Sequence, residues 1–194
     1  HNISIAEEET LLILGDSISA GYGINKKDNW VYLMQQKFYE EGNSIKLINS
    51  SVSGDTTGGG LGRLAKNLKK FDPDFVLIEL GGNDALRGYS IKLIKSNLEK
   101  MIALIKQNKS KVLLMQIRIP PNYGQKYMLA FEKIYKDLAL SEEVYLLPFM
   151  LEEIGINSEL MQPDGIHPNK KAQSLIAKDV KKNIDKFLLI NQSN

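Results

Sequence analysis

One serine and one histidine are the residues of this chain best placed to do chemistry together. Ser17 lies in Gly15-Asp16-Ser17, directly after an apolar run, where its hydroxyl is placed to attack an acyl group. Such a nucleophile needs a general base, and the chain has only 2 histidines. His1 is terminal and unsuited to a fixed geometry, so His167 is the candidate base.

An acidic residue accompanies His167 in the segment Asp164-Gly165-Ile166-His167-Pro168. A tight turn there could bring the Asp164 carboxylate to the imidazole nitrogen that faces away from the serine. This contact would fix the tautomer and stabilise the imidazolium. The simpler interpretations are that Ser17 caps a helix and that His167 only borders an Asp-Gly turn. Taken together, the two segments favour a Ser-His-Asp triad.

Two further turns supply candidate donors for the oxyanion of a tetrahedral intermediate. In Ser53-Gly54-Asp55-Thr56, Gly54 has no Cβ, so its backbone N–H can approach a ligand closely. In Gly81-Gly82-Asn83-Asp84, the Asn83 side chain offers an amide donor. Turn chemistry alone also explains these residue types. Their place after successive apolar runs nevertheless favours an oxyanion hole.

Other candidate sites have less support. The glycine run at 58–62 lacks the Gly-Lys-Ser/Thr of a phosphate-binding loop, and we expect it to be a flexible entry to a helix. Asp16, Asp55 and Asp84 could serve as carboxylate ligands for a metal, but they lie in the turns that a serine hydrolase already explains. We therefore expect neither a metal nor a cofactor. A Gly-x-Ser-x-Gly elbow is absent, which disfavours the large α/β-hydrolase family.

The composition indicates one ordinary globular domain. The chain has 194 residues, of which 43% are hydrophobic and 25% charged. A net charge of +2 provides no strong field for a polyanion, so we expect no nucleic-acid partner. Cysteine is absent, which excludes disulfides and thiolate chemistry. The longest apolar runs are too short for a transmembrane segment.

Short apolar runs alternate along the chain with segments of helical periodicity. Strands are expected at 11–14, 45–48, 75–80, 112–117 and 144–147. Helices are expected after a cap at Asp28, at 61–71, after a cap at Ser90, and at about 125–140 and 169–189. This alternation predicts an α/β protein, a flavodoxin-like three-layer α/β/α sandwich with a five-stranded parallel sheet. We expect a single domain at 10–190, a disordered or processed segment at 1–9, and a tail at 191–194.

The strand-end turns, in their order, resemble the four blocks of the SGNH or GDSL hydrolases. These turns are Gly15-Asp16-Ser17, Gly54, Gly81-Gly82-Asn83-Asp84 and Asp164-Gly165-Ile166-His167-Pro168. The longer strings LLILGDSISAGY, ELGGNDALRG, MQIRIPPNYG and MQPDGIHPN are similar to the bacterial thioesterase I group, also described as lysophospholipases L1 and arylesterases. Ile18 stands where the GDSL name has Leu, an apolar exchange that leaves the catalytic positions intact.

The resemblance implies a role for each residue of the site. Ser17 would be the nucleophile and one N–H donor, Gly54 a second N–H donor and Asn83 the amide donor, with Asp164 and His167 completing the triad. It also implies a cofactor-free esterase and thioesterase acting on acyl-CoA, aryl esters and lysophospholipids, in the periplasm or secreted. A first residue His1 instead of Met suggests a removed leader or a tag remnant, and we expect a monomer.

One segment is a candidate for substrate binding, and two other functions remain open. Leu86, Gly88 and Tyr89 lie beside Asn83, and we expect this loop, 85–90, to close over the acyl chain.

Within the same superfamily, a carbohydrate or phospholipid deacylase would share the catalytic blocks. A flavodoxin-like phosphoacceptor or nucleotide-binding module would use the acidic strand ends, but it leaves the Asp164 to His167 turn unexplained.

Overall fold

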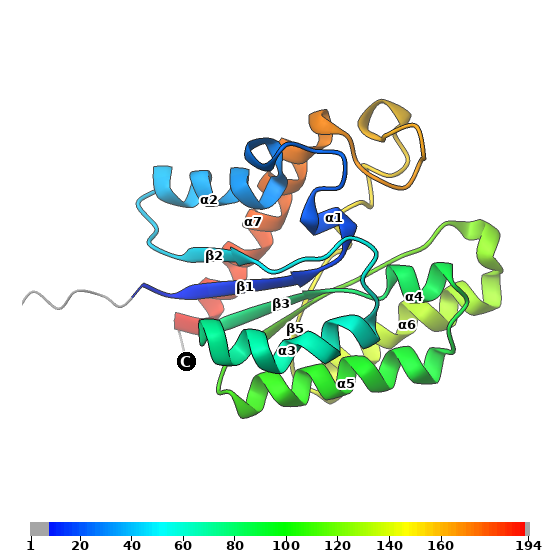
Figure 1. Cartoon of the computed structure of the whole chain (residues 1–194), viewed down its shortest axis with the longest axis horizontal. Coiled ribbons are helices and arrows are strands. Elements are labelled where there is room, and N and C mark those ends of the chain that lie inside the picture. The colour runs from blue at the N-terminus through cyan, green and yellow to red at the C-terminus, as the bar shows by residue number, and fades with distance from the viewer. Residues whose placement is uncertain (1–7, 193–194) are drawn as a thin grey trace, which may run out of the picture.

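The computed structural model describes residues 8–192 and contains one parallel sheet (Figure 1). Its strands lie in the order β2-β1-β3-β4-β5. They are β1 (Thr10–Gly15), β2 (Lys46–Asn49), β3 (Phe75–Glu79), β4 (Lys111–Met115) and β5 (Tyr145–Leu147). The predicted fold class, a five-stranded parallel sheet in an α/β protein, is confirmed.

Helices cover both faces of the sheet (Figure 1). One layer holds α2 (Trp30–Glu40) and α7 (Lys170–Gln192), and the other holds α3 (Thr57–Phe71), α5 (Ile91–Gln107) and α6 (Gln125–Ser141). Shorter elements complete the chain: α1 (Ser17–Ala20), α4 (Gly82–Leu86), η1 (Lys26–Asp28), η2 (Pro121–Tyr123) and η3 (Ser158–Leu160). Because both faces are covered, every residue of β3 is buried, as expected for a parallel strand.

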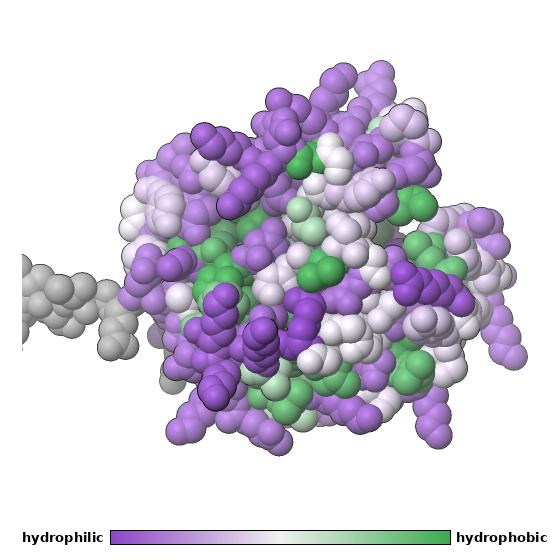
Figure 2. Space-filling model, viewed as in Figure 1, coloured by the Kyte–Doolittle hydropathy of each residue, from purple (hydrophilic) through white to green (hydrophobic). Residues whose placement is uncertain are grey.

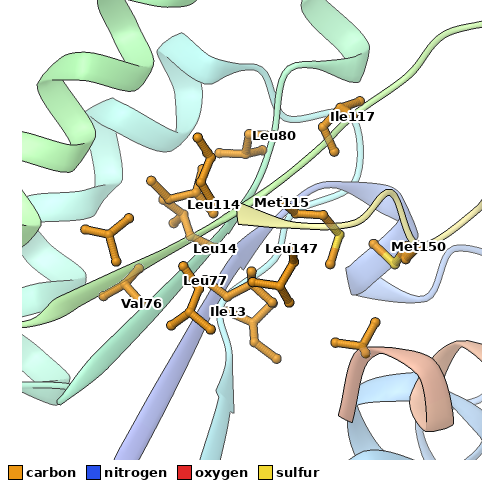
Figure 3. Packing of buried hydrophobic residues seen from close by; sticks show 14 of the residues in the cluster. Ile13, Leu14, Val76, Leu77, Leu80, Leu114, Met115, Ile117, Leu147 and Met150 are labelled. Atoms are coloured by element: carbon orange, nitrogen blue, oxygen red, sulfur yellow. The ribbon is translucent and has the colours of Figure 1, made fainter. Parts of the chain in front are cut away.

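The hydrophobic core fills the space between the sheet and its helices and continues past the strand ends (Figure 3). Ile13, Leu77 and Leu114 are fully buried in neighbouring strands. Each such side chain stabilises the fold by roughly 1.5–3 kcal/mol relative to an exposed one. Ile117 and Met150 belong to the same cluster although they follow β4 and β5. The core therefore extends to the sheet edge where the strand-end turns lie.

Two helix starts differ from the sequence-based expectation. Asn29, not Asp28, caps α2, because the buried Asn29 side chain accepts the Val31 N–H at 2.7 Å. The glycine run at 58–62 is not a flexible entry but the first turns of α3, which begins at Thr57. Close packing gives the reason, since a Cβ on Gly60 would lie 2.3 Å from Leu80 Cδ1. The glycine lets this helix approach the strand end.

The ends of the expected domain and one expected loop also differ. Residues 1–7 and 193–194, which belong to the predicted terminal segments, lie outside the described residues, and α7 continues to Gln192, past the expected boundary at 190. The segment expected as a loop from residue 85 begins inside α4, while Ser90 caps α5 as predicted by accepting the Leu93 N–H. Within 8–192, no helix is long and apolar enough to cross a membrane.

The strand order determines where the functional turns meet. The chain leaves β1 toward β2 on one side, whereas β3, β4 and β5 follow on the other side. The carboxyl ends of β1 and β3 therefore flank the switch point of the sheet, which is the usual ligand crevice of this architecture. Ser17 follows β1 and Asn83 follows β3, so the topology alone brings the two turns together.

Candidate active site

The turn after β1 presents Ser17 at the first position of α1. Asp16, not Ser17, caps this helix, because its Oδ1 accepts the Ile18 N–H at 2.9 Å. The Ser17 hydroxyl is thereby left for another partner, which argues against the capping interpretation of Ser17. Gly15 is required by the tight approach of β3, since a Cβ there would lie 2.5 Å from Glu79 Oε2.

Ser17, His167 and Asp164 form a continuous hydrogen-bonded chain. Ser17 Oγ lies 2.9 Å from His167 Nε2, and His167 Nδ1 lies 2.6 Å from Asp164 Oδ2. Asp164 Oδ1 also accepts the backbone N–H groups of Ile166 at 2.9 Å and His167 at 3.0 Å. The His167 N–H is the main cause that lowers the pKa of Asp164 to about 2. The carboxylate is thus ionised at neutral pH, as a partner for an imidazolium must be.

The turn that carries His167 is held mainly by contacts within residues 161–168. Met161 and Pro168 form an antiparallel bridge, and the Gln162 N–H donates to the His167 carbonyl at 2.7 Å. The Gln162 side chain also donates to the Tyr22 carbonyl at 2.8 Å. The Tyr22 ring lies against the imidazole with 4.5 Å between the ring centroids. These contacts fix the His167 ring beside the turn after β1.

The candidate oxyanion donors Asn83 and Gly54 belong to turns that are joined by a hydrogen bond. Asn83, in the first turn of α4, donates through Nδ2 to the Asp55 carbonyl at 2.8 Å, and this nitrogen also lies 3.4 Å from Asp16 Oδ2. The first of these bonds joins Asn83 to the loop of Gly54, whose φ is 80°. Among residues 8–192, neither the Ser17 N–H nor the Gly54 N–H has a hydrogen-bond acceptor. Both are therefore available to a ligand.

A cavity of about 550 Å³ opens beside Ser17, Asn83 and His167. Its volume falls in the range of small-molecule sites. Most of its lining is apolar: Ile18, Leu86, Ile117, Ile119, Pro120, Pro121, Phe149, Met150, Leu151, Ile156, Met161 and Ile166. Of the three predicted substrate-binding residues, the lining includes Leu86 but neither Gly88 nor Tyr89. The reason is that α4 ends in a tight turn beyond Leu86, in which the Gly88 N–H donates to the Ala85 carbonyl at 3.0 Å.

Two residues of the site escaped the sequence analysis. Arg63 of α3 donates to Asp55 at 2.7 Å and to the Gly15 carbonyl at 3.2 Å, which ties the Gly54 loop to the end of β1. Glu79 closes β3 and is buried beneath the turn after β1. An acidic residue inside the apolar run Phe75 to Leu80 was the available signal, because a buried carboxyl needs a partner. No local sequence pattern indicated that Arg63 would contact the site.

The three aspartates considered as metal ligands have separate partners. Asp16 caps α1, Asp55 pairs with Arg63, and Asp84 accepts the Thr57 N–H at 2.9 Å. Over the described residues, no group of three or more His, Cys, Asp or Glu side chains could hold a metal ion. These aspartates organise the strand-end turns.

Comparison with known proteins decides the family. A family model described as the GDSL-like Lipase/Acylhydrolase family matches residues 13–175, which is most of the chain. The chain belongs to this family. The resemblance noted from the four sequence blocks is thereby confirmed, as is the prediction of an ester-hydrolysing enzyme. Neither the match nor the triad geometry favours a phosphoacceptor or a nucleotide-binding module.

Relatives of this GDSL-like acylhydrolase extend over nearly the whole chain. An arylesterase of Vibrio mimicus is 49% identical over 93% of this chain and 90% of its own length. The thioesterase 1/protease 1/lysophospholipase L1 of Escherichia coli is 45% identical over 89% and 81%, respectively. The psychrotrophic esterase EstA from Pseudoalteromonas sp., in a structure inhibited by monoethylphosphonate, superimposes with a TM-score of 0.92 at 42% identity, covering 93% of this chain and 99% of that one.

Proposed function

We propose that this acylhydrolase cleaves acyl esters and thioesters through a covalent acyl-enzyme on Ser17. The observation that carries the proposal is the chain of hydrogen bonds from Ser17 through His167 to Asp164 at the mouth of an apolar cavity. The relatives named arylesterase and thioesterase 1/lysophospholipase L1 support both leaving-group classes, with oxygen or sulfur as the atom released.

Acylation uses the groups that the geometry brings together. His167 Nε2 accepts the Ser17 proton while Oγ bonds to the acyl carbon, and Asp164 stabilises the resulting imidazolium. The N–H groups of Ser17 and Gly54 and the Asn83 amide donate to the oxyanion. The imidazolium then gives its proton to the leaving oxygen or sulfur. Only neutral imidazole can accept the Ser17 proton.

Deacylation repeats the same steps with water as the nucleophile. His167 accepts a proton from water as the water oxygen bonds to the acyl carbon, and the oxyanion returns to the same donors. Collapse of this intermediate breaks the bond to Ser17 Oγ, which regains its proton from the imidazolium. A carboxylic acid leaves, and the resting triad is restored. Every proton is accounted for by Ser17, His167 and water.

The cavity favours an apolar acyl group over a sugar. Ile117, Ile119 and Met150 belong both to the hydrophobic core and to the cavity lining, so the acyl site has a rigid apolar floor. A carbohydrate deacylase would need polar groups that converge on the sugar hydroxyls. The charged side chains Arg118 and Glu152 instead pair with each other at 2.6 Å. Lysophospholipids and acyl-CoA supply the apolar chain that such a floor accommodates.

A labelling experiment tests whether Ser17 is the nucleophile, and a substrate panel tests which esters and thioesters the protein hydrolyses. A fluorophosphonate should label the wild type and the matched Ser44→Ala control, whose serine is exposed, but not Ser17→Ala. Acyl-CoA, p-nitrophenyl esters and lysophosphatidylcholine, each across chain lengths, should be hydrolysed in the presence of EDTA. Absence of labelling would refute the acyl-enzyme, and loss of turnover in EDTA that a divalent ion restores would refute the metal-free mechanism.

We also propose a periplasmic or secreted location and a monomeric state. The resemblance to the bacterial thioesterase I group supports export. Figure 2 supports the monomer, because on the face shown hydrophilic side chains dominate and hydrophobic ones gather in small groups. Fractionation of the source cells should find the activity outside the cytoplasm, and size-exclusion chromatography with light scattering should give the mass of one chain, 21.8 kDa.

A further inference from the structure

Two carboxyl groups lie buried beneath the nucleophile turn. The Glu79 and Asp16 residues are 2% and 5% exposed. Glu79 Oε2 accepts the Asp16 N–H at 3.1 Å and the Ser19 hydroxyl at 2.9 Å. The charge of Asp16 also acts on Glu79, so the two carboxyl groups are neighbours in a buried site. One side chain of β3 therefore contacts the residues on both sides of Ser17.

A hydrogen bond between these two carboxyl groups would require a proton on one of them, because two carboxylates offer only acceptors. Burial and the neighbouring charge both disfavour ionising the pair completely. Burial raises the pKa of Glu79 well above its ordinary value, and Asp16 raises it further. Burial raises the pKa of Asp16 to about 6, but the Ile18 N–H that Asp16 accepts and the field of His167 both favour its ionised form. These differences favour Glu79 over Asp16 as the residue that keeps a shared proton.

The surrounding charged groups leave this assignment intact. Arg63 directs its charge to Asp55, although it also donates to the Gly15 carbonyl. Tyr135, on α6, donates to the Leu80 carbonyl. Asp55 and His167 face Asp16, the first raising and the second lowering its pKa. Asp84, on α4, accepts hydrogen bonds from Thr57.

We propose that Glu79 is a positioning residue that acts as a neutral carboxylic acid and holds the nucleophile turn on β3. It donates its proton to Asp16 and accepts from the Asp16 N–H and the Ser19 hydroxyl. Asp16 in turn lies 3.4 Å from the Asn83 amide, so the same contacts reach an oxyanion donor. This inference rests on the proposed function, since it concerns the alignment of Ser17 for attack.

Glutamine at position 79 provides the decisive variant. Its carbonyl oxygen can accept as Glu79 Oε2 does, while its NH₂ donates to Asp16 as a neutral carboxyl would. Glu79→Gln should keep kcat and KM close to those of the wild type. Glu79→Ala removes these contacts, so kcat should fall by about 10²-fold through misplacement of Ser17, with little change in KM. Glu153→Gln, an exposed glutamate, is the matched control.

The pH dependence provides a readout that a merely structural role would not change. Because the folded-state pKa of Glu79 is raised, its contribution to stability is fully present below its ordinary pKa of 4.5 and is lost as the pH rises through the folded value. The wild type should therefore lose kcat and stability as the pH rises and Glu79 ionises. Glu79→Gln should lack this loss, and Glu153→Gln should keep it.

The outcomes separate this inference from the proposed function. If the wild type is not labelled by a fluorophosphonate, the acyl-enzyme itself is wrong. If the wild type is labelled, the inference is overturned when Glu79→Gln is inactive, when Glu79→Ala is normal, or when Glu79→Gln keeps the loss of kcat with rising pH. Should Glu79→Ala fail to fold, the activity and pH profile of Glu79→Gln alone decide the question.

Discussion

The nucleophile and its base are held in place by two different kinds of structure. Ser17 directly follows β1 at the switch point of the sheet, and the residues beside it are tied to a buried carboxyl of β3. His167 lies beyond the last strand, in a turn where the Asp164 side chain is 38% exposed. One position depends on the core and on long-range contacts, whereas the other depends mostly on hydrogen bonds within residues 161–168.

Because of this difference, substitutions in the two regions should affect the stability of the fold to different extents even where both lower activity. Changes around the end of β1 disturb buried polar groups, whose unpaired donors cost about 1–3 kcal/mol each. Changes in the turn of Asp164 leave solvent free to replace lost contacts, so the fold should tolerate them. Substitutions on the two sides can thus be compared by measuring the rate and the free energy of unfolding of each variant.

Ser17→Ala should have the largest effect on rate. Loss of the nucleophile should lower kcat by about 10⁶-fold, because binding and oxyanion stabilisation alone cannot form the acyl-enzyme. The free energy of unfolding should hardly change, since the helix cap is supplied by Asp16 and not by the removed hydroxyl. Steady-state kinetics and urea unfolding check both statements. Substantial turnover by a folded variant would exclude Ser17 as the nucleophile.

Asp164→Asn should follow with a loss of about 10⁴-fold in kcat. An asparagine oxygen can still accept the N–H groups of Ile166 and His167, so the turn should persist. Its NH₂ would face His167 Nδ1, however, and favour the tautomer that cannot accept the Ser17 proton. A Tm close to that of the wild type, together with the loss of rate, would support this account. A normal rate would remove Asp164 from the triad.

Asn83→Ala should lower kcat by about 10²–10³-fold, or roughly 2.7–4 kcal/mol, for one deleted oxyanion donor. It should also destabilise the fold by about 1 kcal/mol, because the bond from Asn83 to the Asp55 carbonyl is lost. Asn83→Asp should be at least as damaging to rate, since a carboxylate repels the oxyanion. If both variants keep normal turnover, Asn83 is a structural residue and the proposed oxyanion hole is wrong.

The fold was predictable because its signals are local. Buried strands appear as short apolar runs, and glycine or asparagine turns mark where these runs end. The order of the runs then predicts a parallel sheet, whose carboxyl edge collects the turns of Ser17, Gly54 and Asn83. The hydrogen bonds that join Ser17, His167 and Asp164 agree with the roles expected from their types and spacing.

The remaining features depend on partners far away in the sequence. Ser19 and Glu79 are separated by 60 positions, so no local pattern could pair them. The glycine run in α3 follows the helix because Leu80 leaves no room for a side chain at Gly60. Asp28 and Asn29 are both good capping residues, and only burial in the folded chain selects the second.

The smallest effects should appear in the pH dependence of stability. The contributions of the two regions to stability change in opposite directions as the pH rises. Burial is the main cause that raises the pKa of Asp16 to about 6. Its contribution to stability is therefore complete below its ordinary pKa of 3.8 and is lost as the pH rises toward 6. The His167 N–H is the main cause that lowers the pKa of Asp164 to about 2, so its contribution is complete above 3.8 and is lost as the pH falls toward 2.

Two isosteric variants should resolve these opposite slopes. Asp16→Asn keeps the cap on Ile18 and should make the decline in stability between about pH 4 and pH 6 shallower, because an amide does not ionise. Asp164→Asn should leave that decline unchanged and weaken only the loss below about pH 4, by a small amount because solvent screens this exposed carboxylate. Urea unfolding followed by the fluorescence of the buried Trp30, the only tryptophan, measures both. If Asp164→Asn instead flattens the decline above pH 4, or Asp16→Asn leaves it unchanged, the contrast between a buried and an exposed half of the site is wrong.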